Sequence, residues 1–304
     1  MKNILILGGL GFIGSNLIEE FLKHDDFYLI VFDFPGRTNS FGPRLKVISG
    51  DFSNEDLIDS ILRDNRIDIV IHLISNTIPA SSNENIVYDI EANLIPTIKL
   101  LRLLSIHKVN EIVFFSSGGS IYGPTSDEMV NEGHPTYPIS SHGVVKLTIE
   151  KYIHLYHKLY GVNFLNLRVG NPYGPYQSSD KQGIINVFIR KILNNEKLIV
   201  RGDGSSIRDY IYVKDLAKIV NLLLKKGVLN ETINIGSGKG TSVNQIISIL
   251  SELLRINCSV DYSQALHSDV PQIILDINKL EDILHFEQCD IRQGIKDTLK
   301  SIMK

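Results

Sequence analysis

Three glycines at regular spacing constrain the fold of this chain more than any other feature. Gly8, Gly11 and Gly14 lie between an apolar run and a helical pattern in the stretch LILGGLGFIGSNLIEEF. Glycines at these places permit a tight turn, a close approach of the main chain to a pyrophosphate, and close packing of the helix on the strand. Amides at the start of the helix, which includes Phe12 and Ile13, would then face the phosphate charge. The stretch therefore predicts a dinucleotide-binding turn made by these five residues.

An acidic residue follows at the distance that this kind of turn requires. Asp33 ends the second apolar run, nineteen residues after Gly14, where a carboxylate can bind the ribose hydroxyls of NAD. The same carboxylate would repel the additional phosphate of NADP. Arg37 lies close enough in the sequence to keep NADP as an alternative. We predict NAD as the cofactor and no metal site.

Apolar runs of strand length alternate with segments of helical period through the first half of the chain. Near-continuous apolar strands, each followed by a helix, indicate a parallel sheet that is covered on both faces. We therefore expect an α/β fold of the Rossmann type, a doubly wound parallel sheet with a smaller C-terminal substrate lobe. The large domain should comprise residues 1–169 and about 209–236, and the lobe about 170–208 and 237–304. The six runs are ILIL at 4–7, YLIVF at 28–32, LKVIS at 45–49, DIVIHLI at 68–74, EIVFF at 111–115 and VNFLNL at 162–167.

Two long amphipathic helices are expected at 84–106 and 139–160, where apolar residues recur every three or four positions. Pro96 interrupts the first pattern, so we expect a kink or a late start there. Gly161 stands where a C-terminal glycine would end the second helix. Shorter helices are expected near 183–194 and 243–254.

Composition argues against several classes of partner. Lys plus Arg total 31 and Asp plus Glu total 34, so the formal net charge is −3, without the basic block that a nucleic-acid binder uses. A long apolar segment is absent from the sequence, which argues against a membrane span and against export. The two cysteines, Cys258 and Cys289, are too few for a disulfide framework and suit a reducing compartment. We expect a cytoplasmic protein that binds neither nucleic acid nor membrane.

Beyond the glycine turn, five segments occur in an order that is found in one known family. Together with the turn they resemble the extended short-chain dehydrogenases that act on nucleotide sugars, most closely the bacterial UDP-glucose and UDP-N-acetylglucosamine 4-epimerases. The resemblance covers nearly the whole chain. The segments are GDF at 50–52, FFSSGGSIYG at 114–123, SSHGVVKLTIEKY at 140–152, LRVGNPYGP at 167–175 and RGDGSSIRDYIYVKD at 201–215.

The resemblance implies further site residues. Asp51 and Phe52 should lie at the adenine, and Lys146 at the nicotinamide ribose. Asn171 and Arg208 should contact the diphosphate of the sugar nucleotide, where a guanidinium can hydrogen bond two phosphate oxygens and keeps its charge. Two more cofactor contacts are expected at Leu73 and Asn93.

The expected catalytic residues depart from the pattern of the family. Family members use a tyrosine whose pKa is lowered by a neighbouring lysine, with a Ser or Thr holding the hydroxyl. Here His142 stands at the tyrosine position, four residues before Lys146, and Gly118 stands at the Ser or Thr position between Ser117 and Ser120. An imidazole is largely neutral at pH 7 and can act as a base, although it is shorter than a phenol. The alternative is that His142 only packs or binds.

The resemblance also separates reaction types. Dehydratases of the family carry an Asp-Glu pair beside the Ser or Thr, and here those two positions are Gly119 and Ser120. We therefore expect a nucleotide-sugar 4-epimerase that acts on a UDP-hexose or UDP-N-acetylhexosamine by transient oxidation at C4, in polysaccharide biosynthesis. The alternatives are a 4-reductase or dehydrogenase, and a binding protein that has lost its acid and base. A homodimer through the two long helices is also expected.

Overall fold

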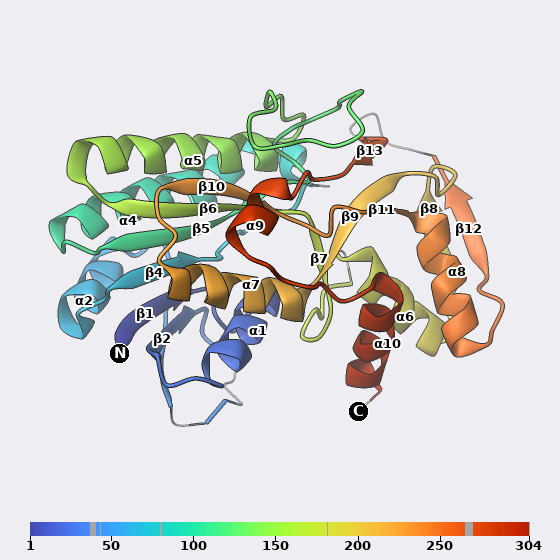
Figure 1. The fold of residues 1–304 in the computed structure, drawn as a ribbon, viewed down its shortest axis with the longest axis horizontal. Helices are drawn as coiled ribbons and strands as arrows, with labels where there is room; N and C mark the ends of the chain where they lie inside the picture. Colours follow the sequence, from blue (N-terminus) through green and yellow to red (C-terminus); the bar gives the residue numbers. More distant parts are fainter. Residues whose placement is uncertain (37–40, 43, 80, 181, 265–269, 304) are drawn as a thin grey trace.

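The structure of the protein is a computed structural model (Figure 1). It describes residues 1–36, 41–42, 44–79, 81–180, 182–264 and 270–303. Arg37, on which the NADP alternative depended, lies outside these residues.

A parallel sheet forms the centre of the large domain. In the described part of the chain it has seven strands in the order β10-β6-β5-β4-β1-β2-β3, and every neighbouring pair is parallel. The chain runs from β1 to one edge through β2 and β3, and β4 then lies on the other side of β1. Such a reversal leaves a crevice at the carboxyl ends of the strands. The strands are β1 (Lys2–Leu7), β2 (Phe27–Asp33), β3 (Leu45–Ser49), β4 (Ile69–His72), β5 (Glu111–Ser117), β6 (Asn163–Val169) and β10 (Glu231–Ile235).

Helices cover both faces of this sheet, which confirms the doubly wound α/β prediction (Figure 1). All six apolar runs form strands; β10, with the sequence ETINI, has too few apolar residues for such a pattern. Alternate strand residues point into two separate cores, so that Ile6 packs with one set of helices and Leu5 with the other. The first set is α1 (Phe12–Phe21) and α7 (Val213–Lys226), and the second is α2 (Glu55–Asn65), α4 (Ile95–Ile106) and α5 (Ser141–Tyr160).

The two long helices differ in regularity. The segment expected at 84–106 is divided into α3 (Ile86–Asp89), a π-helical turn η2 (Ile90–Leu94) and α4. Pro96 is the second residue of α4 and follows directly on the π-helical turn, so the helical segment changes its hydrogen-bond pattern at the point where a kink or late start was expected. α5 is continuous to Tyr160 and ends at Gly161, whose φ of +73° is left-handed. In the described segments, no helix combines the length and apolarity that a membrane crossing needs.

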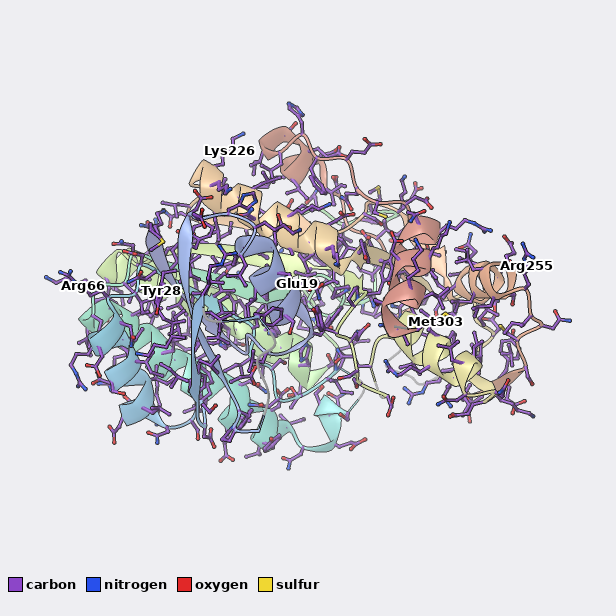
Figure 2. The ribbon with its side chains drawn as sticks, turned by 90° about the horizontal axis from the view of Figure 1, so that it is seen from below. Glu19, Tyr28, Arg66, Lys226, Arg255 and Met303 are labelled. Carbon is purple, nitrogen blue, oxygen red and sulfur yellow. The ribbon has the colours of Figure 1, made fainter. Side chains whose placement is uncertain are left out.

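Smaller sheets and three helices form a lobe beside the carboxyl edge of the large sheet. Figure 2, viewed from below, shows Arg255 and Met303 in this lobe at one end of the molecule, and Tyr28 and Arg66 at the other end. We retain the two-part division of the chain as a proposal, with the return to the large domain at about residue 209. Within the expected lobe segment, α9 (Asn278–Ile283) packs against the core of the large domain. The lobe contains β7 (Asn171–Tyr173), α6 (Ile184–Leu193), β8 (Leu198–Arg201), β9 (Ile207–Tyr212), β11 (Gly240–Ser242), α8 (Val243–Leu254), β12 (Val260–Ser263), β13 (Gln272–Ile273) and α10 (Ile291–Ile302).

The first residue of β5, Glu111, is a buried carboxyl group that makes stability depend on pH. Its side chain is 6% exposed, and its Oε1 atom has no hydrogen-bond partner among the described residues. Burial raises the pKa of Glu111 from 4.5 to about 7. Between these pH values the folded protein binds a proton that the unfolded chain releases. The free energy of unfolding therefore falls as the pH rises from 4.5 to about 7, and the loss is complete above that value.

Replacement of Glu111 by glutamine should remove this loss. We expect the variant to be more stable than the unmodified protein by about 2–3 kcal/mol at pH 8 and by much less at pH 5. Urea denaturation at both pH values measures the difference, with the exposed Glu196→Gln as the control. An equal effect at the two pH values would contradict the assignment.

Candidate active site

The glycine turn has the geometry that its spacing predicts. Gly8 adopts a left-handed φ of +82° at the end of β1, and its N–H donates to Phe32 O at 2.8 Å. Gly11 is the N-cap of α1. A Cβ atom on Gly14 would lie 2.4 Å from Gly9 O, so helix and turn are in direct main-chain contact. The amides of the first turn of α1 are therefore held at the carboxyl edge of the sheet, where they can bind an anion.

A cavity of about 1210 Å³ lies between this edge and the smaller lobe. It exceeds the roughly 300–1,000 Å³ typical of a pocket for one small ligand, which leaves room for two. The structure brings thirteen of the expected site residues together in its lining. These are Gly8, Gly11, Phe12, Ile13, Gly14, Asp33, Leu73, Ser117, Ser120, His142, Lys146, Asn171 and Arg208.

Asp33 joins the end of β2 to the glycine turn. Its side chain is buried, its Oδ2 accepts a hydrogen bond from Leu10 N at 2.8 Å, and its Oδ1 accepts one from Phe34 N at 2.8 Å. Because Asp33 also lines the cavity, a carboxylate stands near the helix N-terminus, where it could bind ribose hydroxyls. The turn, the helix terminus and this carboxylate fit NAD.

Two expected adenine contacts lie outside the described lining of the cavity. Phe52 is 3% exposed and packs in the core, with its ring centroid 5.2 Å from that of His72. The side chain of Phe52 is thus a core residue, so any contact with an adenine would come from its main chain. Asp51 is exposed, and its Oδ1 accepts hydrogen bonds from the N–H and the hydroxyl of Ser53, each at 2.8 Å.

Asn93 was expected to contact the cofactor, but in the structure it lies beneath the residues that line the cavity and hydrogen bonds to one of them. Its Oδ1 accepts a hydrogen bond from Asn76 N at 2.8 Å, and its Nδ2 donates to Asp89 Oδ1 at 2.9 Å. Asn76 and Thr77 line the cavity, whereas Asn93 is buried beneath them. Sequence reasoning missed Asn76, Thr77 and Asp89, since nothing in their spacing indicates that a loop after β4 folds onto the π-helical turn.

His142 is the second residue of α5, and the start of the helix fixes its place. Ser140 caps the helix by accepting a hydrogen bond from Gly143 N at 3.2 Å, and the N–H of His142 donates to Ser82 Oγ at 3.1 Å. His142 is 8% exposed and lines the cavity. Burial, and secondly the charge of Lys146, lower the pKa of His142 to about 4. At pH 7 the imidazole is therefore neutral, with a hydrogen on one ring nitrogen and a lone pair on the other.

Lys146 lies one helical turn after His142 and carries the positive charge of the site. Its Nζ donates to Phe115 O at 2.9 Å and lies 4.8 Å from the ring centroid of Phe114. Burial lowers the pKa of Lys146 to about 8, so it remains mostly charged at pH 7. A cation fixed in this way favours the deprotonated form of any hydroxyl beside it.

The structure explains why glycine replaces Ser or Thr at position 118. A Cβ atom on Gly118 would lie 2.7 Å from Leu275 Cδ1 and 3.0 Å from Arg168 O. The space that a larger residue would need is filled by Leu275, which is itself 1% exposed. Hydroxyl groups reach the cavity from Ser117 and Ser120 instead.

The lobe supplies two cations to the cavity. Arg208, on β9, donates from Nη1 to Ile207 O at 2.8 Å, which orients its guanidinium. Arg201, at the end of β8, also lines the cavity and was not expected from the sequence. Asn171 is the first residue of β7 and also lines the cavity. A diphosphate in this half of the cavity would therefore meet guanidinium groups and an amide.

Comparison with known proteins identifies the family of this chain. Residues 4–236 match the model of the NAD dependent epimerase/dehydratase family. The chain is 36% identical over 296 residues to a putative UDP-glucose 4-epimerase of Methanocaldococcus jannaschii, covering 96% of each chain. It is 30% identical over 311 residues to a dTDP-4-dehydro-6-deoxyglucose reductase of Escherichia coli, covering 99% of this chain and 98% of that protein.

A solved structure extends the similarity to three dimensions. The UDP-glucose 4-epimerase of Thermotoga maritima, determined with UDP-glucose, superposes with a TM-score of 0.93 at 30% identity over 99% of this chain and 98% of that one. The fold of the chain is thus accounted for by one family. The chain belongs to the NAD-dependent epimerase/dehydratase family, within the extended short-chain dehydrogenases, and its cofactor is NAD.

Proposed function

We propose that this protein is an NAD-dependent nucleotide-sugar 4-epimerase, that its substrate is a UDP-hexose or UDP-N-acetylhexosamine, and that His142 is its catalytic base. The observation that carries the proposal is a neutral imidazole beside a buried lysine, at the wall of a cavity with room for both cofactor and substrate. The relatives named as UDP-glucose 4-epimerases support the choice of a UDP-sugar.

The side chains can perform the proton transfers of this reaction. The free lone pair of His142 accepts the proton of the C4 hydroxyl, and later returns it when the alcohol is formed again. Lys146 stabilises the developing alkoxide by its charge, and Ser120 offers a hydroxyl to hold the sugar oxygen. When bound, NAD supplies reversible hydride acceptance at C4. Epimerisation then requires that the keto sugar present its other face before the hydride returns.

A dehydratase needs an acid and a base beside position 118 to eliminate water, and the two neighbouring residues in this chain carry no carboxylate. The two positions that hold a carboxylate pair in dehydratases are Gly119 and Ser120, and both line the cavity. The similarity to a reductase supports a second candidate, net reduction of a 4-keto sugar. The two reactions differ in cofactor use, because a reductase consumes reduced cofactor in stoichiometric amounts and an epimerase does not.

Proton NMR of four sugar nucleotides tests the proposal. UDP-glucose, UDP-galactose, UDP-N-acetylglucosamine and UDP-N-acetylgalactosamine are each incubated with the protein and NAD. We expect the C4 epimer of at least one, without net change in NADH absorbance. Unchanged spectra for all four, with NAD binding shown separately by calorimetry, would overturn the proposed substrate class.

The pKa of His142 determines the pH dependence that we expect. A base acts when unprotonated, and the pKa of His142 is lowered to about 4. The rate constant kcat/KM should therefore be constant from about pH 5 to 7 and should fall about tenfold per unit below pH 4. Initial rates in overlapping buffers, corrected for unfolding, measure this profile. An acid limb near the ordinary histidine value of 6.5 would show that burial does not control the imidazole.

We also propose a homodimer formed through α4 and α5, in the cytoplasm. Apolar side chains are exposed along the outer face of these helices; Leu159 is 60% exposed and Ile106 is 56% exposed. Such a patch is typical of an interface. Light scattering should give twice the mass of one chain, and Leu155→Asp combined with Leu159→Asp should give the mass of a single chain. A monomeric unmodified protein would contradict this proposal. The location is supported by the unpaired Cys258 and Cys289.

A further inference from the structure

An exposed aromatic ring lies in the lining of the cavity at its cofactor end. Phe34 follows β2 directly, lines the cavity and is 42% exposed. It belongs to none of the three apolar cores of the described residues and is not packed against any of them. The other Phe and Tyr side chains of the described lining are part of a core or pack against one; they are Phe12, Phe32, Phe115, Tyr173, Phe188 and Tyr210. The core of the protein therefore does not explain this ring.

Hydrogen bonds of Asp33 fix the main chain from which the ring extends. The N–H of Phe34 donates to Asp33 Oδ1 at 2.8 Å, and Asp33 Oδ2 accepts from Leu10 N in the glycine turn, also at 2.8 Å. One carboxylate thus connects the main chain of Phe34 to the turn. Because consecutive Cα atoms are about 3.8 Å apart, the ring begins one residue away from the group that could bind the ribose of NAD.

We propose that the ring of Phe34 stacks on the adenine of NAD. In a dinucleotide the base and the pyrophosphate extend from opposite ends of the ribose. With the pyrophosphate at the amides of α1 and the ribose hydroxyls at Asp33, the base comes within reach of the next side chain, which is Phe34. The proposal rests on NAD as the cofactor and does not depend on the epimerase reaction.

The residues that were expected at the adenine leave its face uncovered. The ring of Phe52 lies in the core, 5.2 Å between centroids from His72, so it cannot stack on a base in the cavity. Asp51 carries a carboxylate, which can accept a hydrogen bond from the edge of a base but offers no apolar surface. An aromatic ring covers the face of a base, and every base has such a face. Phe34 supplies this second kind of contact.

The first measurement uses the absence of tryptophan from this chain. Phe34→Trp introduces one indole, whose emission then reports on this position alone. We expect ADP-ribose to quench the emission, because a stacked purine quenches an indole, and ribose 5-phosphate, which has no base, to leave it unchanged. Tyr28→Trp is the matched control, since Tyr28 lies on β2, is 38% exposed and is outside the described lining of the cavity. Unchanged emission from Phe34→Trp, with ADP-ribose binding shown by calorimetry, would overturn the proposal.

The second measurement is the affinity for ADP-ribose, determined by calorimetry. Phe34→Ala should weaken binding about 10- to 100-fold, which is typical of one base stacked on an aromatic side chain. Phe34→Tyr keeps the ring and should bind like the unmodified protein, as should the control Tyr28→Ala. Inosine diphosphate ribose should lose the same factor in Phe34→Ala, because stacking uses the face of the base and not its amino group.

Two results would contradict the contact. Equal affinity of Phe34→Ala and the unmodified protein for ADP-ribose would show that the ring does not contact the base. An equal loss in Phe34→Tyr and Phe34→Ala would show that the position serves the loop and not the stacking; thermal denaturation of both variants checks their folding. Weakened ADP-ribose binding in Phe34→Ala, in a protein that epimerises none of the four sugar nucleotides, would support the contact while overturning the proposed function.

Discussion

Replacement of His142 by alanine is expected to lower kcat by about 10²- to 10⁴-fold, which is the usual contribution of a positioned general base. The reason is local. His142 and Lys146 are the ionisable side chains that α5 contributes to the described lining of the cavity, and the neutral imidazole keeps a lone pair on one ring nitrogen. Single-turnover NMR assays of the variant and the unmodified protein, on the sugar that reacts, measure the ratio.

Two controls give this comparison its meaning. His142→Gln keeps a polar side chain of similar size without a basic nitrogen, so its kcat should fall as far as that of the alanine variant. Calorimetry with NAD should show that both variants still bind the cofactor. If the alanine variant turns over at the unmodified rate, His142 is not the base, and the view that it only packs or binds gains support.

Replacement of Gly14 by alanine is expected to have the second largest effect, on cofactor binding. The added Cβ would lie 2.4 Å from Gly9 O and 2.5 Å from Gly9 Cα. Both are main-chain atoms, so a change of side-chain rotamer cannot relieve the clash. Helix α1 must then move away from the turn, which withdraws its amides from the phosphates. Losing two such hydrogen bonds at about 1.5 kcal/mol each weakens NAD binding by about 100-fold, and overpacking costs about 1–3 kcal/mol of stability.

The matched control for that experiment is Gly133→Ala. Among the described residues its Cβ would contact Asn131 Oδ1 alone, at 3.3 Å, and Gly133 lies in a loop away from α1. Calorimetry with NAD and thermal denaturation are compared for the two variants. Equal NAD affinity in Gly14→Ala and in the unmodified protein would show that the turn does not place the amides at the cofactor.

Much of the fold could be predicted from the sequence because its signals are local. The six apolar runs became strands of the sheet, and Gly161 ended α5 as expected. The glycine turn and Asp33 came together because both stand at the carboxyl ends of adjacent parallel strands, β1 and β2. In each case a few consecutive residues fix the conformation, and the parallel topology brings the strand ends together.

Contacts between distant segments could not be predicted in this way. Phe52 belongs to the core because His72 and the neighbouring apolar side chains enclose it. The tripeptide GDF does not indicate these contacts, because they come from other parts of the chain. Gly118 is small because Leu275, far along the chain, occupies the space beside it. Asn93 supports the wall of the cavity and does not line it, because the loop after β4 lies between them.

The sequence by itself determined the class of fold, the dinucleotide turn and the set of residues that could carry the chemistry. Only the tertiary structure decided how His142 is placed, since its N–H, at the start of α5, donates to the hydroxyl of Ser82, 60 residues earlier in the chain. Secondary structure depends on neighbours along the chain, whereas hydrogen bonds and burial depend on neighbours in space. The pKa values of His142 and Lys146 follow from burial, and burial exists only once the chain has folded.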